Sequence, residues 1–240
     1  MTRFRQLVAE ILDKLSKQAI LVECMVQKGL EALERKSGIA HEVEALEREV
    51  NSQEIEIEES CLEVLALFQP TASDLRILST ILKANGELER IGDLALNLAE
   101  RAEALSEYPG VNVPHQLEEM VRYSLKMLMD ADQSLAEKNV KLARDVCRRD
   151  DQLDAMNREL IVEIAGTMEN NPSQVKAQLH IFSASRIIER IGDHATNIAE
   201  DVLYLVEGEI QRHRFKLNED SPQFPSVEGS GQNLDSFETN

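Results

Sequence analysis

Residues 89–100 read Glu-Arg-Ile-Gly-Asp-Leu-Ala-Leu-Asn-Leu-Ala-Glu, and residues 189–200 read Glu-Arg-Ile-Gly-Asp-His-Ala-Thr-Asn-Ile-Ala-Glu. Nine of the twelve positions are identical. The charged residues are all kept, whereas some apolar positions change, as at Leu94 and His194. A duplicated core needs only its apolar pattern to recur, because cores accept substitutions that keep volume and patterning. The repeat therefore indicates two similar halves and a chemical role for its polar residues.

The first copy fits a helix whose polar side chains form one outward row. At 100° per residue, Asp93, Asn97 and Glu100 lie about 40°, 80° and 20° from Glu89. Four apolar side chains fall between about 140° and 240°, on the opposite face: Ile91, Leu94, Ala95 and Leu98. The polar row therefore points away from the face that packs.

Gly92 and Gly192 stand in the interior of these helices. Glycine there costs up to about 1 kcal/mol relative to alanine, because it loses more conformational freedom on folding. We therefore expect another part of the structure to approach the helix backbone closely at both positions.

Composition favours a soluble protein built from long helices. The chain has 240 residues, of which 42% are hydrophobic, 29% charged and only 4% aromatic. Its formal net charge of −18 disfavours nucleic acid and anionic membranes and favours cations. There is neither an apolar leader at the N-terminus nor an apolar run long enough to span a bilayer, so we expect a cytoplasmic protein. The three cysteines lack the spacing of a disulfide framework or a zinc ribbon: Cys24, Cys61 and Cys147.

Helical periodicity of the apolar residues predicts six long helices, and no segment alternates as a strand does. Thr71-Ala72-Ser73-Asp74 resembles a capping box that opens the third helix, and Asn171-Pro172-Ser173-Gln174 caps the last helix. The expected helices cover 3–36, 39–68, 71 to about 107, 114 to beyond 135, 140–169 and 174 to about 217. We therefore expect an all-α chain of two tandem three-helix bundles, residues 1–110 and 111–217, followed by a disordered acidic tail at 218–240.

The second and third helices of each half are expected to be neighbours, because consecutive helices in a bundle usually pack together. Their acidic residues would then converge, and the resulting repulsion would be relieved by a divalent or trivalent cation. Ligation by oxygen atoms alone suits magnesium, manganese, calcium or iron, and carboxylates from two helices allow more than one metal ion. In the first half this brings Glu47, Asn51 and Glu54 beside Glu89 and Asp93, and in the second half Asp150 and Asp154 beside Glu189 and Asp193.

The alternative is a solvated acidic helix face that binds no metal. Arg90 and Arg190 support it, because each lies about 60° from the neighbouring aspartate on the helical wheel. Recurrence of the whole polar row favours metal binding instead. His194 replaces Leu94 and points with the apolar face, so we expect a packed histidine rather than a ligand.

These motifs resemble the PhoU family of phosphate-uptake and phosphate-signalling regulators. The resemblance lies in Glu-Arg-Ile-Gly-Asp followed by Asn-x-Ala-Glu, which is present twice. Residues 69–76, Gln-Pro-Thr-Ala-Ser-Asp-Leu-Arg, also match the Gln-Pro-x-Ala-x-Asp-Leu-Arg segment of the family. The resemblance covers essentially residues 1 to 210 and implies two similar three-helix bundles.

The resemblance also implies surface metal clusters, with iron or zinc in some members and other ions in others. By position, one cluster would use Glu47, Asn51, Glu89 and Asp93, and the other Asp150, Asp154, Glu189 and Asp193. Asn51 departs from the acidic pattern, so the first site would be weaker or hold fewer ions. Further candidates, as additional ligands or as groups that support the ligands or bond across helices, are Glu54, Asn97, Glu100, Asn197 and Glu200.

As a PhoU-like protein, the chain would be a negative regulator of phosphate import and of the phosphate-starvation response, and not an enzyme. Its partners would be the ATPase subunit of the phosphate ABC transporter and the phosphate sensor histidine kinase, and it would form a homodimer. Association with the membrane would occur only through partners.

Two alternatives remain open. A carboxylate-bridged di-metal enzyme of the ferritin-like type needs Glu-x-x-His pairs that face a bundle interior, and the sequence contains none. A metal-free helical adaptor would use the acidic rows only as a contact surface.

Overall fold

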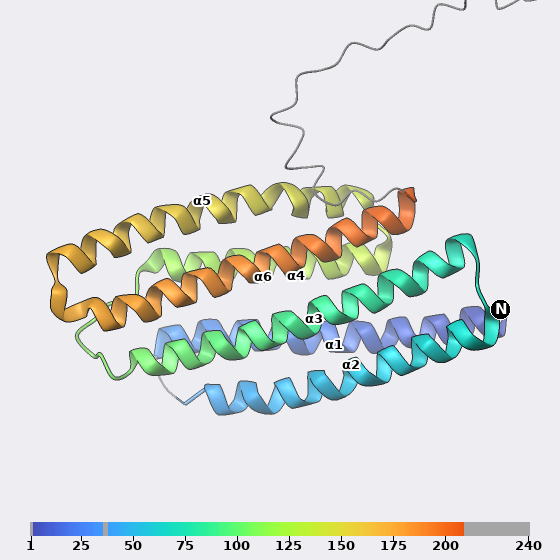
Figure 1. The fold of residues 1–240 in the computed structure, drawn as a ribbon, viewed down its shortest axis with the longest axis horizontal. Helices are drawn as coiled ribbons and strands as arrows, with labels where there is room; N and C mark the ends of the chain where they lie inside the picture. The colour runs from blue at the N-terminus through green and yellow to red at the C-terminus, as the bar shows by residue number, and fades with distance from the viewer. Residues whose placement is uncertain (1, 36–37, 209–240) are drawn as a thin grey trace, which may run out of the picture.

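The computed structural model describes residues 2–35 and 38–208, and these residues form six α-helices and no strand (Figure 1). The prediction of an all-α chain with six long helices is confirmed. The predicted acidic tail at 218–240 lies outside the described residues. The helices are α1 (Arg3–Arg35), α2 (Ala40–Phe68), α3 (Ala72–Leu105), α4 (His115–Glu137), α5 (Val140–Asn170) and α6 (Val175–Glu207), and a 3-10 turn (Pro172–Gln174) precedes α6.

The helix ends lie close to the expected positions, but their caps differ from the predictions. Thr71 stands at the N-cap of α3, yet its side chain makes no capping hydrogen bond, so the capping-box prediction is wrong. The predicted cap of the last helix is also wrong, because Asn171 precedes the 3-10 turn and its side chain makes no capping hydrogen bond. The side chain of Asn139 caps α5 instead, by accepting a hydrogen bond from the Leu142 amide at 3.1 Å. Helix α6 ends at Glu207 and is followed by Gly208, whose φ of 78° lies in the left-handed region that favours glycine. The expected extension of the last helix to about residue 217 lies outside the described residues.

Helices α1–α3 form one bundle and α4–α6 form the second, and the two bundles pack along α3 and α6. In Figure 1, α3 and α6 lie side by side in the middle, with α2 and α5 at the outer edges and α1 and α4 behind. Lys83 of α3 pairs with Asp201 of α6, and Glu87, one turn later, bonds to Asn197. Residue numbers therefore rise along α3 as they fall along α6, and the two halves are related by an approximate twofold axis.

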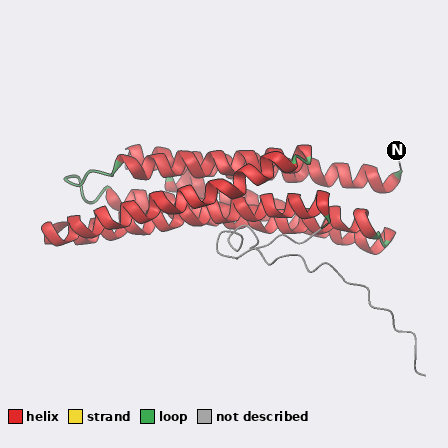
Figure 2. Cartoon of the chain, turned by 90° about the horizontal axis from the view of Figure 1, so that it is seen from above, coloured by secondary structure: helices red, strands yellow, loops and turns green. Residues whose placement is uncertain are grey.

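One continuous hydrophobic core, with side chains from all six helices, runs through both bundles. Seen from above, the helices share one long axis (Figure 2). No helix in the described part of the chain has an apolar stretch long enough to cross a bilayer.

The two glycines of the repeat have different surroundings. A Cβ atom at Gly192 would lie 2.3 Å from Cδ2 of Leu153 on α5, far inside the contact distance. At Gly92 the nearest atom would be Cγ1 of Val50 at 3.5 Å, which is an ordinary van der Waals contact. The expectation of close approach is therefore confirmed at Gly192 and wrong at Gly92. The second bundle is packed more tightly at this level.

Candidate functional site

The first acidic row lies along the contact between α2 and α3 and consists of Glu47, Asn51, Glu54, Glu89 and Asp93. The side-chain amide of Asn85 donates a hydrogen bond to the main-chain carbonyl of Glu54 at 2.9 Å, which fixes the register of the two helices. One turn further along α3, the pKa of Glu89 is raised above its ordinary value. Burial is the largest cause, followed by the negative charges of Asp93, Glu54 and Glu47. The structure therefore brings the acids of the first row within electrostatic reach of one another.

Asn51 lies within this row and has one open acceptor atom. Its Nδ2 donates a hydrogen bond to Oε1 of Glu47 at 2.5 Å. Its Oδ1 is buried and has no hydrogen-bond partner. An amide oxygen is a suitable ligand for a hard cation, so Asn51 can contribute to a site through this atom. Burial, followed by the charge of Glu58, raises the pKa of Glu54 at the end of the row.

The second acidic row lies along the contact between α5 and α6 and consists of Asp150, Asp154, Glu189 and Asp193. Asp150 is buried and accepts a hydrogen bond from the Thr196 hydroxyl at 3.4 Å. Burial, followed by the charges of Glu200 and Asp150, raises the pKa of Cys147 to about 12. These two acids, one from each helix, therefore share one negative environment around the thiol.

Arginines on the same helices partly neutralise the second row. Glu189 accepts a hydrogen bond from Nη1 of Arg186 at 2.8 Å, while its other carboxylate oxygen, Oε2, is buried without a hydrogen-bond partner. Asp154 lies 3.9 Å from Nη1 of Arg158. The positive field of these arginines lowers the repulsion that a metal ion would otherwise relieve.

The types of donor atom suit a hard metal ion, but the described side chains are not grouped closely enough to form a metal site in this structure. Carboxylate and amide oxygens are ligands of the kind that magnesium, manganese and iron accept. Asn51 and Glu189 each hold a buried oxygen that lacks a partner. However, within residues 2–35 and 38–208 no three His, Cys, Asp or Glu side chains are grouped closely enough to hold an ion. Metal binding by the two rows stays a prediction.

The outer candidates of the two rows have different roles. Asn97 donates a hydrogen bond to the main-chain carbonyl of Asp93 on its own helix at 2.8 Å. Asn197 instead crosses between the bundles and donates to Oε2 of Glu87 at 3.0 Å. Glu100 is exposed, 3.9 Å from the guanidinium group of Arg101. Equivalent positions of the repeat therefore serve different contacts.

His194 is packed at the contact between α3 and α6, with 12% of its side chain exposed. Its Nδ1 lies 2.6 Å from Oε2 of Glu87, which also accepts the hydrogen bond from Asn197. Burial would raise the pKa of Glu87, but the hydrogen bonds from His194 and Asn197 outweigh burial and lower it.

Sequence reasoning missed Glu87 as the partner of His194. A signal was present, because the two positions change together between the halves: Glu87 and His194 are both polar, and their counterparts Ile187 and Leu94 are both apolar. Such a paired exchange indicates spatial contact across the repeat.

Comparison with protein families identifies both halves. The PhoU domain model matches residues 15–102 and 117–202. The chain belongs to the PhoU family. The two matched segments correspond to α1–α3 and α4–α6, so the duplication read from the sequence is a pair of PhoU domains.

Several PhoU proteins are similar over most of their length. The PhoU homolog of Deinococcus radiodurans, a phosphate-specific transport system accessory protein, is 34% identical over 188 residues, covering 78% of this chain and 88% of that protein. Escherichia coli PhoU, which carries the same description, is 32% identical over 196 residues, covering 80% of each chain. The crystal structure of PhoU from Pseudomonas aeruginosa superposes with a TM-score of 0.83 at 34% identity, covering 86% of this chain and 100% of that one.

Proposed function

We propose that this chain is a non-enzymatic, negative regulator of phosphate uptake and of phosphate-starvation signalling. The observation that carries the proposal is the pair of PhoU domains, matched over most of the chain by relatives named phosphate-specific transport system accessory proteins. Such a role requires protein contacts rather than a reaction centre. The exposed, elongated surface of two long-helix bundles supplies a large area for these contacts (Figure 1).

The partners we propose are the ATPase subunit of the phosphate ABC transporter and the phosphate sensor histidine kinase. An accessory role in transport, as in the names of the relatives, supports the first partner. The chain would act as a homodimer in the cytoplasm and reach the membrane only through these partners. Its strong negative charge supports partners with basic surfaces and argues against direct binding to anionic lipid.

We also propose that the two acidic rows bind metal ions, with iron, zinc, manganese or magnesium as candidates. Carboxylates from two helices allow more than one ion in a row, and the first row, which contains Asn51, would bind more weakly or hold fewer ions. The raised pKa of Glu89 supports this, because a bound cation would offset both its burial, the largest cause, and the neighbouring negative charges. When bound, the ion would link the second and third helices of a domain. The first site would use Glu47, Asn51, Glu89 and Asp93, and the second Asp150, Asp154, Glu189 and Asp193.

Deletion of the gene tests the regulatory role. Cells without the protein are expected to express phosphate-scavenging genes, or to accumulate phosphate, even when phosphate is plentiful. Unaltered expression and phosphate content would refute the regulatory role for this chain.

Complementation then tests the acidic rows. A variant with Asp93→Asn and Asp193→Asn is expected to fold but to fail in restoring repression. Full repression by this variant would favour the metal-free adaptor. Turnover of peroxide, oxygen or phosphoesters that is lost in the variant would favour the di-metal enzyme.

A further inference from the structure

A cleft of about 510 Å³ lies between α1 and α4, on helices that carry neither acidic row. One wall belongs to each PhoU domain. Its volume is typical of pockets for small molecules, which range from about 300 to 1,000 Å³. The lining is mainly apolar and includes Leu12, Leu15, Ile20, Met129, Leu135 and Ala136.

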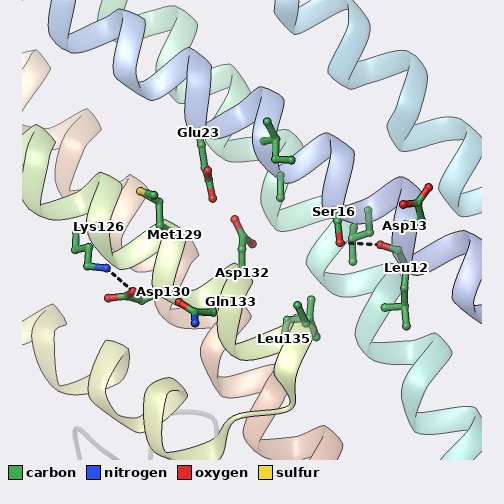
Figure 3. Close-up of a pocket in the computed structure, with 14 residues that line it drawn as sticks. Leu12, Asp13, Ser16, Glu23, Lys126, Met129, Asp130, Asp132, Gln133 and Leu135 are labelled. Carbon is green, nitrogen blue, oxygen red and sulfur yellow. Dashed lines mark hydrogen bonds and ion pairs between the residues drawn. The ribbon is translucent and has the colours of Figure 1, made fainter.

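Two acids in this cleft lack a cationic partner. Glu23 of α1 and Asp132 of α4 point toward one another across the cleft (Figure 3). The other two acids of the lining are neutralised: Asp13 pairs with Lys17 at 2.7 Å, and Asp130 pairs with Lys126 and Arg149, each at 2.7 Å. Among the described residues, no lysine, arginine or histidine forms an ion pair with Glu23 or Asp132.

The environment of the pair is costly for negative charge. Oδ2 of Asp132 is buried and has no hydrogen-bond partner. Burial, followed by the charge of Glu23 and a hydrogen bond to its side chain, raises the pKa of Asp132 well above its ordinary value. Burial also raises the pKa of Glu23, and the hydrogen bond to Asp132 opposes that rise. Asp132 is therefore the protonated member of the pair and donates to the Glu23 carboxylate. A cation bound to the pair would take the place of the shared proton, and its positive charge would stabilise both carboxylates in this buried environment.

The opposite end of the α1–α4 contact is closed. There, Nη2 of Arg122 lies 2.7 Å from Oε1 of Glu34. Met25 of α1 lies against Gly92 and Met127 of α4 lies against Gly192, so the two methionines are equivalent in the two halves. Counted from them, Ala136 is the equivalent of Glu34, and Ile20 is the equivalent of Arg122. Ala136 and Ile20 both line the cleft, and Ile20 is 63% exposed. The chain therefore has an ion pair at one end of this contact and an open apolar cleft at the other.

We propose that the α1–α4 cleft binds a small amphiphilic cation, with its apolar body against the aliphatic lining and a primary ammonium group between Glu23 and Asp132. Binding releases the proton of Asp132 to solvent, and the three N–H donors of the ammonium group are enough to bond to both carboxylates and to a third acceptor. The net charge of −18 attracts cations to the surface of the protein. The occupant touches both PhoU domains, so its binding favours the arrangement of the two bundles seen in this structure.

Calorimetric titration of the full chain with octylammonium, octan-1-ol and octanoate tests the proposal. These probes share one apolar chain and differ in the charge of the head group. Octylammonium is expected to bind one-to-one and at least about tenfold more tightly than either competitor, because hydrogen bonds to charged groups contribute that much or more. The absence of octylammonium binding, or equal binding of octanoate, would overturn the proposal.

Variants separate the acid pair from the apolar lining. Glu23→Gln with Asp132→Asn keeps the shape of the cleft, and it is expected to weaken octylammonium binding at least about tenfold while leaving octanol binding unchanged. Ala136→Phe fills the cleft and should abolish binding of both probes. Glu34→Gln, at the closed end, is the matched control and should change neither affinity. An amide double variant that binds octylammonium as tightly as the native chain would contradict the assignment.

A measurement on the native chain places the probe independently of these variants. Met129 lines the cleft and is 44% exposed, so its methyl group reports on occupancy. In methyl-labelled protein, the Met129 signal, assigned with Met129→Leu, is expected to shift on titration with octylammonium. A shift confined to other methionines would show binding elsewhere and overturn the proposal.

Discussion

Replacing Gly192 with alanine should destabilise the protein relative to the same change at Gly92. At position 192 the new Cβ would lie 2.3 Å from Cδ2 of Leu153, a residue with no exposed surface, so the side chain must move by more than 1 Å to reach ordinary contact. Overpacking of this kind costs about 1–3 kcal/mol. Alanine regains about 1 kcal/mol of helix propensity. The expected net loss for Gly192→Ala is therefore about 0–2 kcal/mol.

Gly92→Ala is the matched control, because the sequence around it is nearly the same. Its Cβ would meet Val50 and Met25 at 3.5 and 3.6 Å, so it keeps the full propensity gain of up to about 1 kcal/mol. Propensity cancels between the two variants, and the free energies of unfolding should differ by the overpacking cost of about 1–3 kcal/mol. Urea denaturation followed by circular dichroism measures this difference. Equal shifts of the midpoint in the two variants would refute the packing argument.

Two further predictions concern titrating groups. Glu87→Gln should cost about 1–3 kcal/mol at neutral pH, because the native carboxylate accepts two partly buried hydrogen bonds. The folded-state pKa of Glu87 is lowered, so its contribution is complete above the unfolded-state pKa and is lost as the pH falls through the folded-state pKa. Urea denaturation from pH 7 to pH 3 checks this, and a native-to-variant gap that widens in acid would contradict it. For the cysteines, an aromatic disulfide reagent at pH 8 should modify exposed Cys24 quickly in the folded protein. Cys61 and Cys147 should resist, because burial is the main cause that raises their pKa values to about 11 and about 12. Rapid reaction of all three thiols would show that this burial is absent.

The helices and the duplication could be predicted from the sequence because they depend on local periodicity. Each helix has an apolar face, and the repeat of residues 89–100 at 189–200 sets the number of halves. The residues that cap the helices were harder to predict from the sequence. Thr71 has the right residue type at the right position, but its side chain makes no capping hydrogen bond, whereas Asn139 does cap its helix.

The proximity of the acids in the first row could also be predicted, because consecutive helices usually pack together. Contacts between the halves were not, since periodicity does not tell which helix of one bundle meets which helix of the other. The pair of Glu87 with His194 joins residues far apart in the chain, and it shows only as a joint exchange between the repeats. The cleft between α1 and α4 depends on the same unpredicted packing.

Metal content tests the central claim most directly. Untagged protein, purified without chelators, should be analysed by mass spectrometry beside Asp93→Asn, Asp193→Asn and the double variant. We expect metal in stoichiometric amounts in the native chain, a partial loss in each single variant and a near-complete loss in the double variant. A native chain that contains no metal and takes up no added iron, zinc, manganese or magnesium, or a double variant that retains its metal, would contradict metal binding by the two rows.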